Sequence, residues 1–267
     1  MGTQTRTGQG FIAGSLIGSL GGLIGLGGAE FRLPVLVGLF RLSTLEAVVL
    51  NKAMSLVVVA AALLFRAKAI PMEQLGQHLD IVVNLLAGSL VGAWWAAGHA
   101  LTMPRTWINR IIMVMLSCMA VLMLSESWLG VQETSVPLFH EGIARLVAGV
   151  VAGFGIGMVA ALLGVAGGEL LIPTIVLLYG IDIKLAGSLS LMVSLPTMIV
   201  GFARYSSSDA FDVLRREQPL FRWMVAGSIL GAGIGGLLLG LMPTRLLMAG
   251  LGGILLISAI KTFRHAR

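Results

Sequence analysis

Long apolar runs alternate along this chain with short polar or charged segments. A helix needs about 20 mostly apolar residues to cross the hydrocarbon core of a bilayer, and several of the runs reach that length. The period-2 alternation over segments of about ten residues that is typical of a membrane β-barrel is missing. The pattern therefore predicts an all-α polytopic membrane protein. We place its elements at about 10–25, 30–42, 43–65, 78–101, 107–125, 141–163, 169–180, 183–204, 219–241 and 244–263.

The chain repeats itself at a shift of 139 positions. The decapeptide GLGGAEFRLP at 25–34 returns as GVAGGELLIP at 164–173. The same shift aligns AGSLVGA, at 87–93, with AGSILGA, at 226–232. A register that is kept over roughly a hundred residues indicates an internal duplication. We interpret the glycine-rich AGSLVGA and AGSILGA segments as sites of close helix packing rather than of chemistry.

The duplication divides the chain into a first membrane repeat, 1–139, and a second, 140–267, which together form one transmembrane domain. Each repeat has five elements, of which the second is shorter than a full span. If all five cross, the odd number inserts the second repeat upside down, as in many secondary transporters. If the short elements are re-entrant, each repeat crosses four times and the two are parallel. Lys and Arg concentrate in cytoplasmic loops, and their distribution favours five crossings, inverted topology and two cytoplasmic termini.

Composition agrees with a membrane location. Hydrophobic residues make up 57% of the chain and charged residues 11%, whereas a soluble domain has about 25% charged residues. The net charge of +6 is explained by basic cytoplasmic loops, and we expect no nucleic-acid partner. The single cysteine, Cys118, lies in an apolar run, and we expect it to pack in the core. The polar start runs directly into the first element, so we expect no cleavable signal peptide.

The repeated decapeptide predicts a break in a membrane helix. Glycine costs about 1 kcal/mol relative to alanine within a helix, and each copy clusters several glycines. Irregular backbone survives in a membrane only where it lines a cavity enclosed by protein. The helix that follows such a break presents unpaired amides and a positive dipole end, which suit an anion. We therefore predict that the backbone at Gly27, Gly28, Ala29, Gly167 and Gly168 binds substrate.

Charged residues follow both breaks. Glu30 and Glu169 begin the two short helices. Their carboxylates either cap the first helical turn or mark an ion pathway, and we assign them to proton coupling. Arg32 is a candidate for substrate binding, as a cation that faces the substrate. It could equally be an internal partner of Glu30 or a side chain that snorkels to the membrane surface.

The third element of each repeat adds polar residues. Asn51 and Ser190 occupy equivalent positions, where they either join helices by hydrogen bonds or bind substrate. Lys52 lies deep in an apolar run, and we expect it to compensate the charge of Glu30 or of an anionic substrate. All three are substrate-binding candidates. Motifs such as HExxH, CxxC and GxSxG do not occur, so we expect a protein that is not an enzyme, with no catalytic residue, metal or cofactor.

The doubled motif resembles that of the TauE/SafE sulfite exporter (TSUP) family, which carries the pattern GxGGGxxxxP once per half. The resemblance covers essentially the whole chain. It departs from the family in two respects, because one glycine of each triplet is an alanine and because the glutamates replace residues that are commonly apolar. The matching residues are Gly25, Gly27, Gly28, Ala29 and Pro34, and then Gly164, Ala166, Gly167, Gly168 and Pro173.

The resemblance implies a secondary transporter that moves sulfite, a sulfonate or a similar small sulfur-containing anion across the bacterial inner membrane. It also implies proton coupling, and we expect alternating access. The expected partners are the anionic substrate, protons and the lipid bilayer, and a homo-oligomer is compatible with the sequence. The alternatives are a passive anion channel and a membrane scaffold or assembly protein that transports nothing. The sequence leaves the identity of the anion and the direction of transport open.

Overall fold

The computed structural model describes residues 3–24, 28–69, 76–129, 142–181 and 183–237, with the isolated positions 253 and 256. Within these residues the chain is helical and has no strand, so the predicted all-α class is confirmed. The predicted first repeat contains α1 (Thr3–Ile24), α2 (Ala29–Gly38), α3 (Thr44–Ala69), α5 (Leu79–Thr102) and α6 (Arg105–Leu129). The second contains α7 (Ile143–Leu163), α8 (Gly168–Tyr179), α9 (Ile183–Tyr205), the 3₁₀ turn η2 (Asp209–Asp212), α10 (Val213–Arg216) and α11 (Gln218–Leu237).

The helices follow the apolar runs to within a few residues at most ends, except at the start of α1 and around α2. The short elements are confirmed as short, with 10 residues in α2 and 12 in α8. The expected element at 244–263 lies almost entirely outside the described residues. The polar segment between α9 and α11 gave no apolar signal, yet it forms η2 and α10. Cys118 was wrongly expected in the core, because it lies exposed on α6.

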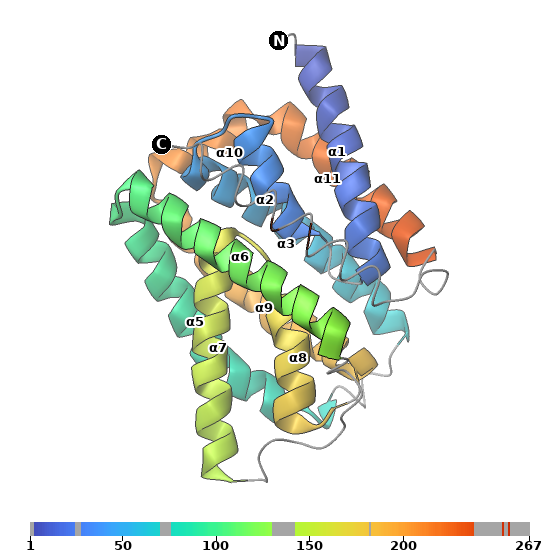
Figure 1. Cartoon of the computed structure of the whole chain (residues 1–267), viewed down its shortest axis with the longest axis vertical. Helices are drawn as coiled ribbons and strands as arrows, with labels where there is room; N and C mark the ends of the chain where they lie inside the picture. The colour runs from blue at the N-terminus through green and yellow to red at the C-terminus, as the bar shows by residue number, and fades with distance from the viewer. Residues whose placement is uncertain are drawn as a thin grey trace.

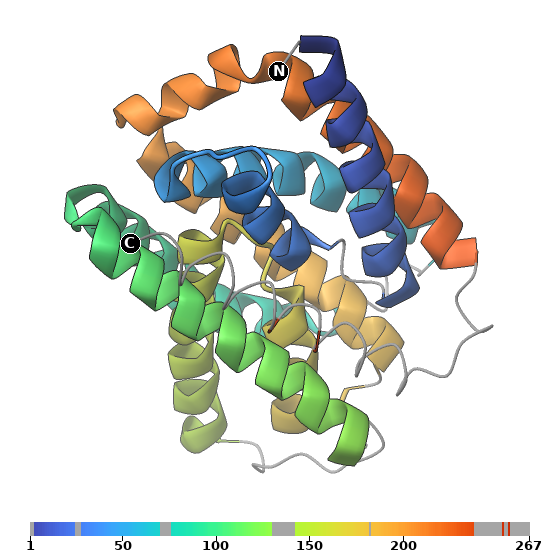
Figure 2. The same cartoon turned by 45° about the horizontal axis from the view of Figure 1, so that its top comes forward.

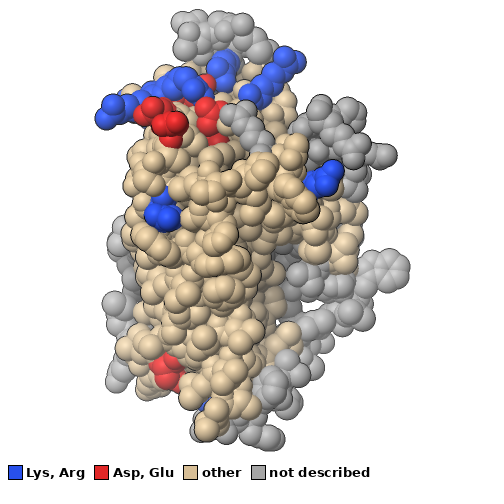
Figure 3. Space-filling model, turned by 90° about the vertical axis from the view of Figure 1, so that its left-hand side faces the viewer, with Lys and Arg blue, Asp and Glu red and all other residues tan. Residues whose placement is uncertain are grey.

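Three helices among the described residues are long and apolar enough to cross a membrane, namely Leu79–Thr102, Ile143–Leu163 and Leu185–Tyr205. Large apolar side chains such as Trp94, Val83 and Val151 face outward from these helices. On the face shown in Figure 3, charged side chains gather mainly at one end, next to a broad band of uncharged side chains. A band of this kind suits contact with lipid. The described helices are therefore consistent with a multi-pass membrane location.

Two long helix pairs frame the molecule. Helix α1 packs along α11, and α5 packs along α7 (Figures 1 and 2). A Cβ atom added to Gly14 would lie 2.3 Å from the carbonyl oxygen of Met224, and one added to Gly153 would lie 2.3 Å from that of Leu85. Both partners of the second contact are related to those of the first by 139 positions. The same relation joins Gly18–Ser228 to Gly157–Ser89, Gly227–Phe11 to Gly88–Val150, and Gly231–Ser15 to Gly92–Phe154.

These contacts explain the glycine-rich segments that the sequence repeats. Glycine lets two helix backbones approach closely in a membrane, where small residues mark the tightest interfaces. Any side chain at these positions would collide with a backbone carbonyl of the neighbouring helix. The glycines of AGSLVGA and AGSILGA therefore serve close helix packing, as expected.

Helices α3 and α9 lie between the two pairs and pack against each other, while α2 packs on α3 and α8 packs on α9. One end of the molecule carries Arg6, Glu46, Arg216 and Glu217, and we call it the charged end. Helix α3 begins at the charged end, next to Glu46. Helix α9 ends there, because Ser207 and Ser208, just after its last residue Tyr205, line one cavity with Glu46. The two equivalent helices thus run in opposite directions.

Candidate functional site

The two glycine-rich breaks have the same backbone geometry where both are described. Gly28 precedes α2 with φ 69° and ψ 20°, and Gly167 precedes α8 with φ 74° and ψ 10°. This left-handed conformation favours glycine. Ala29 and Gly168 are the first residues of the two helices. Gly27 lies outside the described residues, so its predicted role stays a prediction.

Asn51 joins the two breaks. Its side-chain amide donates one hydrogen bond to the carbonyl oxygen of Ala29, at 3.0 Å, and another to that of Leu163, at 3.1 Å. Ala29 opens α2 in the first repeat, and Leu163 closes α7 in the second. Two carbonyl acceptors identify the bonded atom of Asn51 as its nitrogen. Asn51 therefore holds the two repeats together at the level of both breaks.

Lys52 is the next residue along α3 and is wholly buried. Its backbone lies against the second break, because a Cβ atom at Gly164 would come within 3.2 Å of the Lys52 nitrogen. Its side chain crosses to α9, where the Nζ atom lies 5.8 Å from the centre of the Tyr205 ring. Gly201 leaves room for it, since a Cβ atom there would lie 2.5 Å from Nζ.

The ammonium of Lys52 has no hydrogen-bond partner in the part of the chain that the structure describes. The ion pairs found there involve other residues. Aromatic rings attract cations through their negative faces, so Tyr205 contributes weakly to holding this charge. The alternative that Lys52 compensates Glu30 has no support among the described contacts. A compensating anion remains as the other explanation.

Glu30 and Arg32 lie in the first turn of α2, and both are buried. The Glu30 carboxylate acts electrostatically on the Arg32 guanidinium. Arg32 is 0% exposed, so the snorkelling alternative is wrong. Of the three alternatives for Arg32, the internal partner of Glu30 is therefore the one with a described interaction.

The remaining candidates belong to the second repeat. The hydroxyl of Ser190 donates to the carbonyl oxygen of Gly187 within its own helix, at 2.9 Å. This bond fits a structural role for Ser190 better than substrate binding. Glu169 lies in the first turn of α8, but its side chain lies outside the described residues. The structure thus brings Ala29, Asn51 and Lys52 together with the end of α7, and it leaves Ser190 bonded locally.

A comparison with protein families identifies the family of the chain. The family model described as sulfite exporter TauE/SafE matches residues 10–262, which is nearly the whole chain. The chain belongs to the TauE/SafE family. It is thereby a membrane transporter of the sulfite-exporter type, and the predicted family is confirmed. Searches of the curated proteins and of the solved structures found no match.

Sequence reasoning missed several residues of this TauE/SafE protein. Tyr205 donates its hydroxyl to the carbonyl oxygen of Ala161, at 3.2 Å, and so ties α9 to the end of α7. It is one of only two tyrosines in the chain, but its rarity gave no sign of its neighbours. Gly201 was also missed, because a single glycine in an apolar run is common in membrane helices.

The charged end contains a cluster of interacting polar and charged side chains, part of which has a recognisable sequence signal. Ser43 and Glu46 form a capping box at the start of α3: the Glu46 carboxylate accepts bonds from the Ser43 nitrogen, at 3.0 Å, and from its hydroxyl, at 2.7 Å. The S-x-x-E spacing is a known signal of a helix start. Glu46 also pairs with Arg216 of α10, and Arg6 of α1 pairs with Glu217, at 3.4 Å. Both ion pairs link the first repeat to the second.

Glu46 lies before the apolar run of α3, which begins at Ala47. Burial raises the pKa of the Glu46 carboxyl, but the hydrogen bonds from Ser43 and Arg216 outweigh burial and bring its pKa below the ordinary value. The bond to Glu46 in turn raises the pKa of the Arg216 guanidinium. Both groups are therefore charged at neutral pH and hold the pair together.

Proposed function

We propose that this chain is a secondary transporter, and not an enzyme, that carries a small sulfur-containing oxyanion such as sulfite or a sulfonate. The observation that carries the proposal is the buried ammonium of Lys52, for which the described residues offer no countercharge. A buried charge without a partner costs several kcal/mol, so a ligand of opposite charge is a good reason to keep one. The positive ends of α2 and α8 favour the same sign of ligand. The membrane would be a bacterial inner membrane.

The transport cycle that we propose is alternating access between two inverted repeats. The glycine contacts that recur at a shift of 139 support the duplication, and the opposite directions of α3 and α9 support the inversion. Secondary transporters of this plan bind substrate at the interface of the repeats. Asn51 bonds to both repeats at that interface. Basic residues such as Arg6 at the charged end support cytoplasmic termini.

Proton coupling is assigned to Glu30 and Glu169. Protonation of Glu30 removes the negative charge that acts on Arg32, which leaves the guanidinium more attractive to an anion. Proton and anion would therefore be loaded together. Glu169, at the equivalent position of the second repeat, is assigned the same role by symmetry. Neutralising either carboxylate also limits repulsion when both face one cavity.

The test is sulfite accumulation in proteoliposomes under an imposed pH gradient. The wild-type protein should concentrate sulfite, whereas a passive channel only equilibrates it and a scaffold protein moves none. The double variant Glu30→Gln/Glu169→Gln should fold but lose accumulation driven by the pH gradient. Asp80→Asn, which changes an exposed acid at the start of α5, is the matched control. Unchanged accumulation in the double variant would remove the coupling role.

A further inference from the structure

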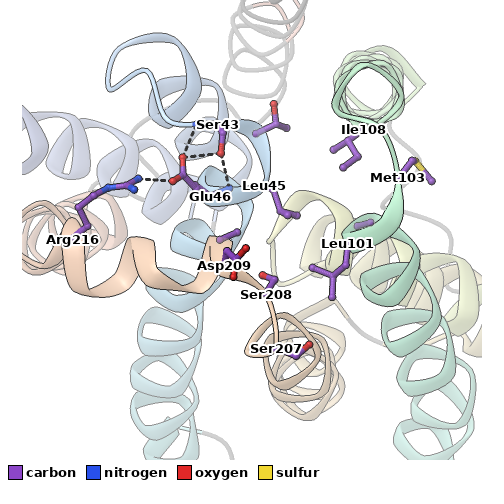
Figure 4. A pocket seen from close by; sticks show the side chains of 13 residues that line it. Ser43, Leu45, Glu46, Leu101, Met103, Ile108, Ser207, Ser208, Asp209 and Arg216 are labelled. Carbon is purple, nitrogen blue, oxygen red and sulfur yellow. Dashed lines mark hydrogen bonds and ion pairs between the residues drawn. The ribbon is translucent and has the colours of Figure 1, made fainter.

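A cavity of about 640 Å³ lies at the charged end (Figure 4). Its walls come from residues 43–46 at the start of α3, from residues 100–108 around the turn between α5 and α6, and from residues 207–216 between α9 and α11. The first two segments belong to the first repeat and the third to the second. The cavity is thus formed between the two repeats, and the pair of Glu46 with Arg216 lies at its edge (Figure 4).

The cavity lies close to the site along two helices. Glu46 precedes Lys52 by six residues on α3, which corresponds to about 9 Å along the helix axis. On the other side, Ser207 in the cavity wall follows Tyr205 by two residues. Tyr205 is wholly buried, its ring lies beside the Lys52 ammonium, and its hydroxyl bonds to α7. Tyr205 therefore stands where the wall of the cavity meets the surroundings of Lys52.

We propose that this cavity is the entrance through which the anion reaches Lys52 from the charged end, and that Tyr205 is the barrier between them. The proposal rests on the proposed function. Hydroxyl groups of Thr44, Ser207 and Ser208 lie in the wall. They donate to Asn109 and to the backbone carbonyls of Arg204 and Tyr205, so each would turn from its acceptor to replace part of the water around an oxyanion. Glu46 adds no net charge to the wall, because Arg216 pairs with it.

Asp209 provides a test of whether the ligand that enters the cavity is negatively charged. It is exposed in the cavity wall, and no ion pair of Asp209 is found among the described residues. Its negative charge repels an approaching anion, and the repulsion weakens as salt screens it. Asp209→Asn should lower the KM for sulfite added on this side at low ionic strength, and the change should shrink at high ionic strength. A KM that rises would contradict an anion entrance.

Cysteine labelling tests the entrance directly. Cys118 is the single cysteine of the chain, so Cys118→Ser gives a background without thiols. Ser207→Cys then places a thiol in the cavity wall, and Ser206→Cys places one on the adjacent exposed residue, which is not part of the wall. Both are treated in proteoliposomes with a membrane-impermeant methanethiosulfonate that carries a sulfonate group. The rate of each variant before labelling is its own reference.

Labelling of Ser207→Cys should remove most sulfite transport, sulfite should slow the labelling, and Ser206→Cys should keep its rate. Equal rates before and after complete labelling of Ser207→Cys would overturn the entrance. Lys52→Met separates this failure from that of the proposed function: if Lys52→Met abolishes transport while labelling does nothing, the anion enters elsewhere and the function stands. If wild-type protein transports no sulfite, the proposed function is refuted, and the proposed entrance is refuted with it.

Tyr205 is tested by Tyr205→Leu, which keeps an apolar side chain but removes the ring and the hydroxyl. With the smaller leucine side chain at this position, sulfite should leak down its gradient without proton movement. Tyr205→Phe keeps the ring, so it should stay tight if the ring is the barrier. Coupled transport without leak in Tyr205→Leu would show that Tyr205 only supports the fold.

Discussion

Replacement of Lys52 by methionine should stabilise this protein while it abolishes transport. Methionine has nearly the shape of the lysine side chain and carries no charge. Lys52 is 0% exposed and its ammonium has no hydrogen-bond partner among the described residues. Replacing a buried ion pair by apolar residues of similar volume is often neutral or stabilising by roughly 1–4 kcal/mol. We expect a gain in the same range for Lys52→Met, because the change leaves no partner charge behind.

The assay is thermal unfolding of the purified protein in detergent, with and without sulfite. Wild-type protein should gain stability from sulfite in proportion to its occupancy, because the anion binds only the folded state. Lys52→Met should unfold at a higher temperature than wild type without ligand, and sulfite should add nothing. In proteoliposomes the same variant should lose sulfite accumulation.

Leu191→Met is the matched control, because Leu191 occupies the position equivalent to Lys52 in the second repeat and is partly buried. Exchanges between leucine and methionine usually cost less than about 1.5 kcal/mol, so this variant should keep both transport and the response to sulfite. A lower unfolding temperature for Lys52→Met would mean that the ammonium is satisfied within the protein. The argument for a missing anion would then be refuted.

Three further predictions test the packing and the polar contacts around the site. Asn51→Ala removes two buried hydrogen bonds, of which the one to Leu163 joins the two repeats, and should lower stability by roughly 1–3 kcal/mol for each carbonyl left unpaired, measured as the loss in thermal midpoint. Gly227→Val forces α1 and α11 apart and should cost about 1–3 kcal/mol, whereas Gly233→Val, with open space around it, should cost little. Because the pKa of Glu46 is below its ordinary value, its stabilising effect is present at neutral pH and is lost as pH falls through that lowered pKa. The difference in thermal midpoint between wild type and Glu46→Gln should therefore vanish in acid, and a difference that persists there would contradict the ion pair with Arg216.

Much of the fold follows from local pattern. Apolar runs of sufficient length place most helices, because a membrane span must satisfy its backbone bonds within itself. The glycine-rich breaks were also predictable, since the left-handed backbone at Gly28 and Gly167 is a conformation that few other residues adopt. Helix α10 was not predictable from the sequence, because it is held by ion pairs such as Arg216–Glu46 and has no apolar run.

The sequence allowed us to predict which residues belong to the site, but not which residues they contact. Asn51 and Lys52 attract attention because polar residues deep in a membrane helix are rare. The contact of Asn51 with Leu163, however, joins residues 112 positions apart, and no local sequence pattern predicts it. The same holds for Lys52, which reaches Gly201 and Tyr205 on α9 instead of Glu30. Long-range packing decides these contacts.

Counterflow of labelled sulfite tests the central claim most directly. Purified protein in proteoliposomes preloaded with unlabelled sulfite should take up labelled sulfite transiently and saturably, and Lys52→Met should take up none. Counterflow by wild-type protein that Lys52→Met retains in full would contradict the account, because the buried ammonium of Lys52 would then play no part in holding the anion.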